Sequence, residues 1–224
     1  MKIAIDGPGG AGKSTFAKLI AKEFSLVYVD TGALYRAIGL SALRLGIDPK
    51  DADGVVPMLD DTHVALEYRD GAQCVILNGE DVSGLIRTSE VSMYASAVSA
   101  IPAVRSFLLK IQKDMVARGN VVMDGRDIGT VIMPDADVKF FLVADPEVRA
   151  RRRYKELCDA GKECSYEDIL RDIEERDKND SERALCPLVP ADDAIMFDNS
   201  GLNIPETLDE MKRLIEERTG EAAK

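Results

Sequence analysis

Short apolar runs alternate with longer amphipathic stretches along the chain. Five runs, each bounded by polar or turn residues, have the pattern of strands that are buried on both faces of a parallel sheet. The predicted strands are Lys2–Asp6, Leu26–Asp30, Val121–Asp124, Val138–Ala144 and Ala194–Asp198.

The stretches between these runs carry apolar residues at helical spacing. One helix is indicated by Phe16, Ile20 and Phe24, a second lies between Pro102 and Gly119, and a third between Pro205 and Gly220. Strands that alternate with helices predict an α/β fold, with a parallel sheet covered by helices on both faces. We therefore expect a single domain over residues 1–224.

One region departs from this alternation. Two strand-like runs, Val64–Arg69 and Gln73–Leu77, are joined by Asp70-Gly71, and Asp-Gly between alternating runs is a strong hairpin signal. Because an antiparallel hairpin does not belong inside a parallel core, we expect it in a small insertion over residues 62–85.

Composition and charge exclude several classes of function. The 224 residues are 46% hydrophobic and 31% charged, as in ordinary globular domains. The net charge of −11 disfavours nucleic acid or an anionic membrane as a partner, and no run approaches the ~20 apolar residues of a membrane span. The cysteines lack C-x-x-C spacing, and His63 is the only histidine, so we expect no zinc site and a cytoplasmic location with reduced thiols.

The first predicted strand runs into "GPGGAGKS", which fits G-x-x-x-x-G-K-[ST] and precedes a predicted helix. Glycines let backbone N–H groups curl around a phosphate, Lys13 can bridge the β- and γ-phosphates, and the Ser14 hydroxyl can ligate Mg²⁺. The alternative is a tight strand-to-helix turn with an incidental lysine. We assign ATP binding to Gly7, Pro8, Gly9, Gly10, Ala11, Gly12, Lys13, Ser14 and Thr15.

Further motifs indicate a second anion site. A guanine-specific N/T-K-x-D motif is absent, whereas "VDTGALYR" and "MDGRDIGT" follow two predicted strands and supply Arg36 and Arg126. The carboxyl ends of parallel strands bind ligands, and guanidinium groups suit phosphate oxygens. These motifs predict transfer of a phosphoryl group to a second, anionic substrate.

Together with the glycine loop, both motifs closely resemble the cytidylate kinases of bacterial type. The resemblance continues through "NGEDVSGLIRTSEV", "YASAVSAIPAVR" and "RDKNDSERALCPLVPA", and spans the chain from Ile3 to the final helix. It implies a three-layer P-loop kinase fold with a five-stranded sheet of order 2-3-1-4-5, a substrate-binding segment over residues 31–100 and a lid over residues 149–165. The implied reaction is Mg²⁺-dependent transfer from ATP to CMP or dCMP, by a monomer.

The resemblance also implies roles for single residues. Arg36 and Arg126 would grip the CMP phosphate, although surface salt bridges are the alternative for both. Asp127 would accept from the exocyclic amine of cytosine, and Asp124 would lie near Mg²⁺ or cap the Gly125 turn. The implied CMP site comprises Thr31, Tyr35, Arg36, Ser96, Arg105, Asp124, Gly125, Arg126, Asp127, Arg176, Asp180 and Arg183.

The segment "EVRARRRYKELCDAG" concentrates arginines in an acidic chain. A solvated helix face that pairs with Glu147 and Glu156 explains part of this cluster. The resemblance places the segment at the lid, where Arg152 and Arg153 would close over the transferring phosphate. With Lys13 and Arg126, they form the implied catalytic set.

Two other functions stay open from the residues alone. An adenylate or shikimate kinase would also need Lys13 and the arginines, but not the set Ser96, Arg105, Asp127 and Arg183. A regulatory module that binds nucleotide without turnover would have no use for a second phosphate grip.

Overall fold

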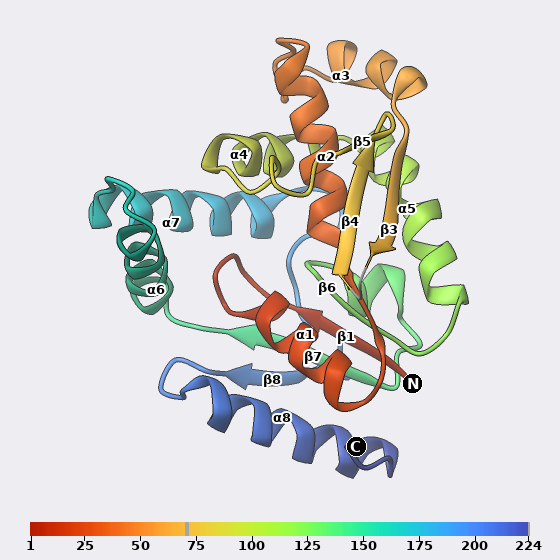
Figure 1. Cartoon of the computed structure of the whole chain (residues 1–224), viewed down its shortest axis with the longest axis vertical. Helices are drawn as coiled ribbons and strands as arrows, with labels where there is room; N and C mark the ends of the chain where they lie inside the picture. Colours follow the sequence, from red (N-terminus) through yellow and green to blue (C-terminus); the bar gives the residue numbers. More distant parts are fainter. Residues whose placement is uncertain (70–71, 224) are drawn as a thin grey trace. The chain divides into compact units, whose positions relative to one another are not determined.

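The computed structural model describes residues 1–69 and 72–223 (Figure 1). The chain divides into two compact units, one formed by Met1–Tyr28 with Gly119–Lys224 and the other by Val29–Arg118.

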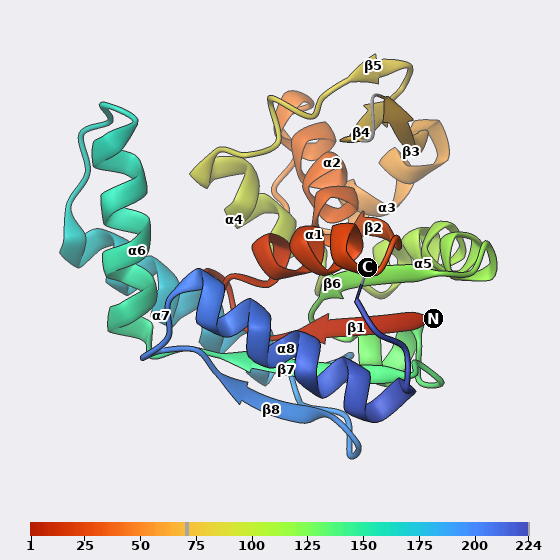
Figure 2. The ribbon, with the colours of Figure 1, turned by 60° about the horizontal axis from the view of Figure 1, so that its bottom comes forward.

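A parallel sheet organises the first unit. Its strands follow the order β2-β6-β1-β7-β8, which is 2-3-1-4-5 when these five strands are numbered along the chain, so the predicted fold is confirmed. In Figure 2, β6, β1, β7 and β8 follow one another across the sheet. The strands are β1 (Lys2–Asp6), β2 (Val27–Asp30), β6 (Val121–Gly125), β7 (Val138–Val143) and β8 (Ile195–Asp198).

The register of this sheet brings the ends of its central strands together. β1 pairs in parallel with β6 and with β7, and Asp6 lies opposite Gly125 on one side and Phe141 on the other. The loops that leave β1, β6 and β7 therefore emerge at the same edge, where open α/β sheets bind ligands.

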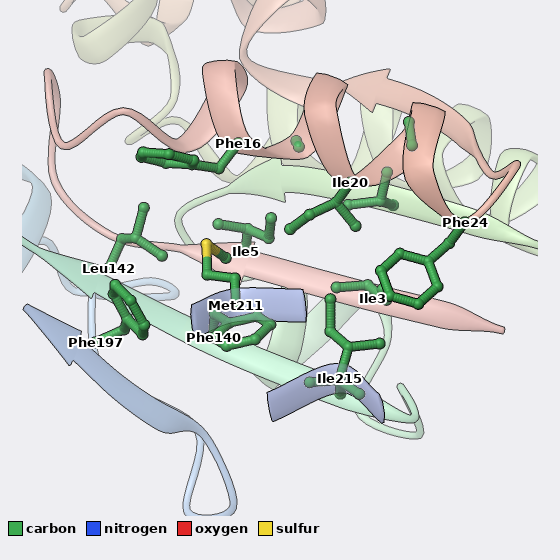
Figure 3. Close-up of a cluster of buried hydrophobic side chains, with 14 of the residues drawn as sticks. Ile3, Ile5, Phe16, Ile20, Phe24, Phe140, Leu142, Phe197, Met211 and Ile215 are labelled. Atoms are coloured by element: carbon green, nitrogen blue, oxygen red, sulfur yellow. The ribbon is translucent and has the colours of Figure 1, made fainter. Parts of the chain in front are cut away.

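Apolar side chains on both faces of the central strand explain why it is buried. Ile3 and Ile5 of β1 point to one face and join Phe140 and Leu142 of β7 in a cluster with side chains of two helices (Figure 3). Ala4, which points to the opposite face of β1, is also fully buried. Burying each large apolar side chain contributes roughly 1.5–3 kcal/mol, so this core fixes the platform on which the loops stand.

The helices of the first unit flank this sheet. α1 and α8 contact each other and share the cluster of Figure 3, which contains Phe16 and Ile20 of α1 and Met211 of α8. α8 begins with a capping box at Asn203 and ends at Gly220 in the left-handed region. The helices are α1 (Lys13–Glu23), the short π-helical turn η2 (Ile128–Ile132), α6 (Pro146–Asp159), α7 (Tyr166–Glu182) and α8 (Ile204–Thr219).

The second unit is built around α2, which contacts α4, α5, β3 and β4. A Cβ at Gly39 would lie 2.8 Å from Ala95 N, so the glycine lets α2 and α4 approach closely. The helices are α2 (Thr31–Arg44), α3 (Ala52–Met58), the 3-10 segment η1 (Leu59–Asp61), α4 (Ser89–Val98) and α5 (Pro102–Ala117).

The hairpin strands of the second unit follow the prediction. β3 (Val64–Arg69) and β4 (Ala72–Leu77) pair antiparallel, and the short β5 (Glu80–Asp81) adds a third strand next to β4. The predicted turn at Asp70-Gly71 lies outside the described residues.

A membrane span was not expected from the sequence. Within the described residues, no single helix is long and apolar enough to cross a membrane, although α4 and α5, bent by 101° at their junction, jointly satisfy a test of length and composition.

Candidate active site

The glycine loop connects β1 to α1 in a conformation that only glycine permits at two points. Gly7 has φ of 143°, and a Cβ there would lie 2.1 Å from the carbonyl oxygen of Leu142. Gly12 is the N-cap of α1 with φ of 90°, and a Cβ there would meet the ring of Phe16 at 2.9 Å. Since this N-cap has no side chain to accept from them, the first N–H groups of α1 could bind an anion instead.

Lys13 is the first residue of α1, and its side chain is folded back over this loop. Its Nζ donates to the carbonyl oxygen of Pro8 at 2.6 Å. Burial and the charges of Arg126 and Arg176 lower the pKa of Lys13 well below its usual value, although Asp124 and Asp180 oppose this. Because these arginines and Lys13 repel one another, a polyanion that binds among them would be strongly stabilised.

Ser14 is linked to the end of β6. Its Oγ donates to Asp124 Oδ2 at 2.7 Å, and the hydroxyl of Tyr28 donates to Asp124 Oδ1 at 2.9 Å. Asp124 is buried, so this hydroxyl and carboxylate form a defined pair of oxygen groups beside the glycine loop.

Arg126 follows β6 and binds the carboxylate of Asp180 on α7. Its Nε donates to Asp180 Oδ2 at 2.7 Å, with side chains only 18% and 6% exposed, so the pair does not lie on the surface. Burial lowers the pKa of Arg126, but the charge and hydrogen bond of Asp180 more than offset this. For the carboxyl group of Asp180, burial raises the pKa. The charges of Arg126 and Arg176 outweigh this effect, so the pKa of Asp180 lies below its usual value.

Arg176 of α7 and Arg183, the residue directly after this helix, lie beside the same carboxylate and the glycine loop. A Cβ built on Gly9 would lie 3.5 Å from Arg176 Nη1 and 3.6 Å from Arg126 Nη2, so both guanidinium groups face the glycine loop. Arg183 Nη1 is 4.0 Å from Asp180 Oδ1, and its Nε donates to the carbonyl oxygen of Cys186 at 2.5 Å. We call Arg126, Arg176, Asp180 and Arg183 the inner arginine cluster.

Asp127 occupies the N-cap position of η2, and its side chain is buried. Its carboxylate makes no capping hydrogen bond to this turn. The cap is instead supplied by Asp6, which sequence reasoning treated only as the end of a strand.

The two predicted lid arginines have different surroundings. Arg152 donates to Asn199 Oδ1 at 3.1 Å and to the Asn199 carbonyl oxygen at 2.9 Å. Asn199 in turn donates to the carbonyl oxygen of Ala11 in the glycine loop at 2.9 Å. Arg153, by contrast, is 43% exposed and pairs with Glu156 on the surface of α6.

The most buried arginine of α6 is one that was not singled out from the sequence. Arg149, whose side chain is 2% exposed, donates to the carbonyl oxygens of Ala144 at 2.8 Å and Gly9 at 2.9 Å. It also forms an ion pair with Asp177 of α7 at 2.5 Å. Arg149 therefore ties α6 and α7 to the glycine loop.

In the second unit, Asp30 organises Arg36. Asp30 caps α2 by accepting from Ala33 N at 2.9 Å, and its Oδ1 lies 3.7 Å from Arg36 Nη1. Arg87, which was not predicted, donates to Asp30 Oδ2 at 2.7 Å. Thr31 is the buried first residue of α2.

A second group in this unit connects α2, α4 and α5. The guanidinium of Arg105 lies 5.6 Å from the centre of the Tyr35 ring. Arg105 Nη1 donates to the carbonyl oxygen of Ser99 at 3.3 Å, and Ser99 Oγ donates to the carbonyl oxygen of Ser96 at 2.7 Å. The three predicted residues Tyr35, Ser96 and Arg105 therefore belong to one local group.

A cage of protein ligands for a metal is not found in the part of the chain that the structure describes, where no group of three His, Cys, Asp or Glu side chains could hold an ion. Ser14 and Asp124 together offer hard oxygen groups, the type that Mg²⁺ prefers. Mg²⁺ commonly takes only one or two protein oxygens, with nucleotide phosphates and waters completing its shell, so these residues fit that ion.

Sequence comparisons with known proteins agree over nearly the whole chain. A family model described as "Cytidylate kinase" matches residues 3–217. The chain is 51% identical over 217 residues to a cytidylate kinase from Fervidobacterium nodosum, covering 97% of each sequence. It is 47% identical over 215 residues to a cytidylate kinase from Carboxydothermus hydrogenoformans, covering 96% of this chain and 97% of that one. Among solved structures, a shikimate kinase from Bacteroides thetaiotaomicron superposes on 96% of this chain and 98% of its own, with 14% identity and a TM-score of 0.49.

Proposed function

The chain belongs to the cytidylate kinase family and phosphorylates CMP and dCMP, and we propose that it does so by direct in-line transfer from Mg²⁺-bound ATP, with the residues assigned below. No histidine or cysteine nucleophile is needed for such a reaction. In phosphoryl transfer the protein positions two phosphates and neutralises the charge that spreads over them in the transition state.

We assign the donor phosphates to the glycine loop and Lys13. The loop and the first turn of α1 supply backbone N–H groups, with the predicted residues Gly7 to Thr15 lining this site. Burial and neighbouring arginines destabilise the ammonium form of Lys13, which the β- and γ-phosphates of ATP would stabilise again. The ammonium group of Lys13 would therefore be far more stable with the triphosphate bound than without it.

We propose that Ser14 holds Mg²⁺, with Asp124 adjacent to it. Bound Mg²⁺ would supply charge neutralisation at the β- and γ-phosphates. The hydrogen bond of 2.7 Å from Ser14 to Asp124 orients the hydroxyl oxygen, and Tyr28 fixes the other oxygen of the same carboxylate.

One observation carries the acceptor assignment: Arg126 and Arg176 face Gly9 of the donor loop at 3.5 to 3.6 Å from its ideal Cβ position. Arginines serving an acceptor phosphate must lie close to the donor loop, because the transferring group passes directly between donor and acceptor. We propose that Arg126 grips the CMP phosphate, that Asp180 and Arg176 serve the ribose, and that Asp180 holds Arg126 in its orientation through their hydrogen bond.

The second unit contributes the remaining CMP contacts in this proposal. Arg36 would bind the CMP phosphate, and its orientation is supported by Asp30. Ser96 and Arg105 would contact cytosine, and the Tyr35 ring supports the Arg105 guanidinium. Thr31 would lie beside these groups at the start of α2.

Cytosine is distinguished from uracil by its exocyclic amine, which is a hydrogen-bond donor. We propose that the carboxylate of Asp127 accepts from this amine, and that Arg183 donates to the acceptor edge of the base. Gly125 is the last residue of β6 and directly precedes this segment.

The lid of this proposal covers residues 149–165, and the substrate-binding segment covers residues 31–100, within one kinase domain. Arg152 and Arg153 would stabilise the transferring phosphate when the lid closes. Arg152 is connected to the glycine loop through Asn199, which supports its place among these groups. The monomeric state and the cytoplasmic location that the family implies belong to the same proposal.

A coupled assay of ADP release tests the proposed reaction with a panel of acceptors. CMP and dCMP should support turnover that depends on ATP and Mg²⁺, and UMP, AMP, GMP and shikimate should be poorer acceptors. Equal rates with CMP and AMP would contradict the assignment of Ser96, Arg105, Asp127 and Arg183 to recognition of cytosine. Turnover that survives chelation of divalent cations would contradict the Mg²⁺ site at Ser14.

A further inference from the structure

The short turn η2 is capped by a residue 122 positions away in the sequence. Asp6 Oδ1 accepts from Ile128 N at 2.8 Å, and Asp6 Oδ2 accepts from Gly129 N at 2.7 Å. Asp6 is 4% exposed, so both hydrogen bonds are shielded from water. A buried carboxylate that accepts hydrogen bonds from two backbone N–H groups is a specific structural contact, unlike a chance contact on the surface.

This cap is unusual because η2 already has an aspartate at its N-cap. Aspartate at this position usually accepts from the first N–H groups of the turn. Asp127 does not do so here, and Asp6 makes the capping contacts in its place.

The two ties to Asp6 bracket the segment that carries Arg126 and Asp127. On one side, Asp6 is the register partner of Gly125 in the sheet. On the other side, its carboxylate holds Ile128 N and Gly129 N. Only Arg126 and Asp127 lie between these fixed points.

The packing at Gly129 shows how close this contact is. A Cβ there would lie 3.4 Å from Asp6 Oδ2 and 3.2 Å from Cδ of Lys139. A side chain at this position would press against both neighbours, so glycine permits the approach of the backbone to the carboxylate.

We propose that Asp6 is a positioning residue for the CMP site, because its carboxylate holds the segment that presents Arg126 and Asp127 to the acceptor nucleotide. This inference rests on the assignment of Arg126 and Asp127 to CMP made above. Asp6 itself touches neither substrate in this proposal and acts through the backbone of residues 125–129.

The ionisation of Asp6 gives the contact a pH dependence. Burial raises the pKa of Asp6, the hydrogen bonds from Gly129 and Ile128 lower it, the charge of Asp127 raises it and that of Lys13 lowers it, and the net pKa is about 6. The methylenes of Lys139 also lie beside this carboxylate, at the position of the missing Gly129 side chain. Protonation would turn one acceptor oxygen into a donor facing an N–H group, and the cap would be weakened.

The substitution Asp6→Asn tests the proposal, because the amide keeps the size but replaces one acceptor with a donor. We expect kcat/KM for CMP to fall by roughly tenfold to a hundredfold, as for the loss of one or two buried hydrogen bonds that serve the transition state. The preference for CMP over UMP should narrow, and the Kd of ATP, measured by direct binding, should change less than about twofold.

Asp137→Asn is the matched control. Asp137 Oδ2 accepts from Lys2 N at 2.7 Å, so it makes the same kind of contact at the opposite end of β1. This variant should leave both kinetic constants for CMP within about twofold of wild type.

A second measurement uses the wild-type enzyme and does not depend on the folding of a variant. The ratio of kcat/KM for CMP to that for UMP should fall as the pH drops through about 6. Because both nucleotides carry the same phosphate, the ratio cancels the ionisation of the substrate phosphate. In Asp6→Asn the ratio should be independent of pH over this range.

The outcomes separate this inference from the assignment beneath it. Arg126→Ala and Asp127→Asn measured in parallel test whether these residues serve CMP at all. If they impair CMP use while Asp6→Asn leaves it unchanged, Asp6 is not a positioning residue. If Asp6→Asn weakens ATP binding as much as CMP use, its role is to support the glycine loop, and the proposal is overturned.

Discussion

Two groups of arginines in this acidic chain have opposite surroundings. In the inner arginine cluster, the side chains of Arg126 and Arg183 are only 18% and 7% exposed, and both lie against the carboxylate of the buried Asp180. On α6, Arg151 and Arg153 are 64% and 43% exposed and pair with glutamates of their own helix. Exposed pairs of this kind contribute only about 0–1 kcal/mol.

The difference teaches that local density of arginine does not identify a phosphate site. The inner cluster comes from distant segments that the sheet edge and α7 bring together, and the buried Asp180 holds the Arg126 guanidinium through a hydrogen bond. The exposed pairs of α6 form between residues three or four apart and need no tertiary structure. The predictions that follow test this distinction, from the largest expected effect to the smallest.

Lys13→Ala should have the largest effect. Lys13 shares its electrostatic environment with Arg126 and Arg176, and charge-assisted hydrogen bonds are worth about 1.5–3 kcal/mol each, with more in a closed site. We expect turnover to fall by at least a factor of roughly 10² to 10³ with the fold intact. Steady-state kinetics and circular dichroism measure both properties, and a variant that keeps turnover within a few-fold of wild type would exclude the glycine loop as donor site.

Arg149→Leu should have the largest effect on stability. The change leaves Asp177 and the carbonyl oxygens of Ala144 and Gly9 without this donor, and breaking a buried ion pair costs about 3–5 kcal/mol. Arg151→Leu on the same helix should change the free energy of unfolding by less than about 1 kcal/mol, because its pair with Glu147 is exposed. Urea denaturation of both variants compares buried and exposed arginines directly, and equal losses would remove the distinction between them.

How far the sequence predicts this molecule depends on how local each signal is. The strands and the glycine loop were predicted to within a residue or so, because burial on both faces and the motif both leave a pattern in adjacent residues. Arg126 and Asp180 were found through motifs, and the structure adds their hydrogen bond.

The missed residues have partners far away in the chain. Asp6 contacts residues 122 and 123 positions on, and Arg149 reaches Gly9 across 140 positions. Arg149 looks like its neighbours in sequence, and only the packing of α6 against α7 and the glycine loop distinguishes it. Contacts of this kind leave no periodicity or motif to read.

Asp127→Asn should change the choice of base. A carboxylate opposite the carbonyl of uracil opposes two acceptors, a mismatch of roughly 1–3 kcal/mol or a factor of about 5 to 150. The amide can rotate to donate, so the variant should lose activity on CMP and narrow the gap to UMP. Values of kcat/KM for both nucleotides provide the test, and an equal loss on both would show that Asp127 does not read the base.

The smallest predicted effect is a dependence of stability on pH. The pKa of Asp6 is about 6 in the folded protein and 3.8 as the ordinary value, so the folded state binds more protons between these limits. The free energy of unfolding therefore falls as the pH rises through about 6, because the folded state gives up this proton. Between about pH 5 and about pH 7, the free energy of unfolding of wild type should fall by about 1 kcal/mol relative to Asp6→Asn. Chemical denaturation across this range measures the free energy of unfolding of both proteins. The difference between wild type and Asp6→Asn should change with pH, and a constant difference would contradict the prediction.

The central claim, that the inner arginine cluster serves the acceptor nucleotide, is tested most directly by Arg126→Ala with Arg151→Ala as control. We measure kcat/KM for CMP at saturating ATP, and the Kd of ATP by direct binding. Arg126→Ala should lower kcat/KM for CMP by a factor on the order of 10² or more, with the Kd of ATP changed only a few-fold, and Arg151→Ala should match wild type in both. Equal losses of CMP use and ATP affinity in Arg126→Ala would place this arginine on the donor side and contradict the claim.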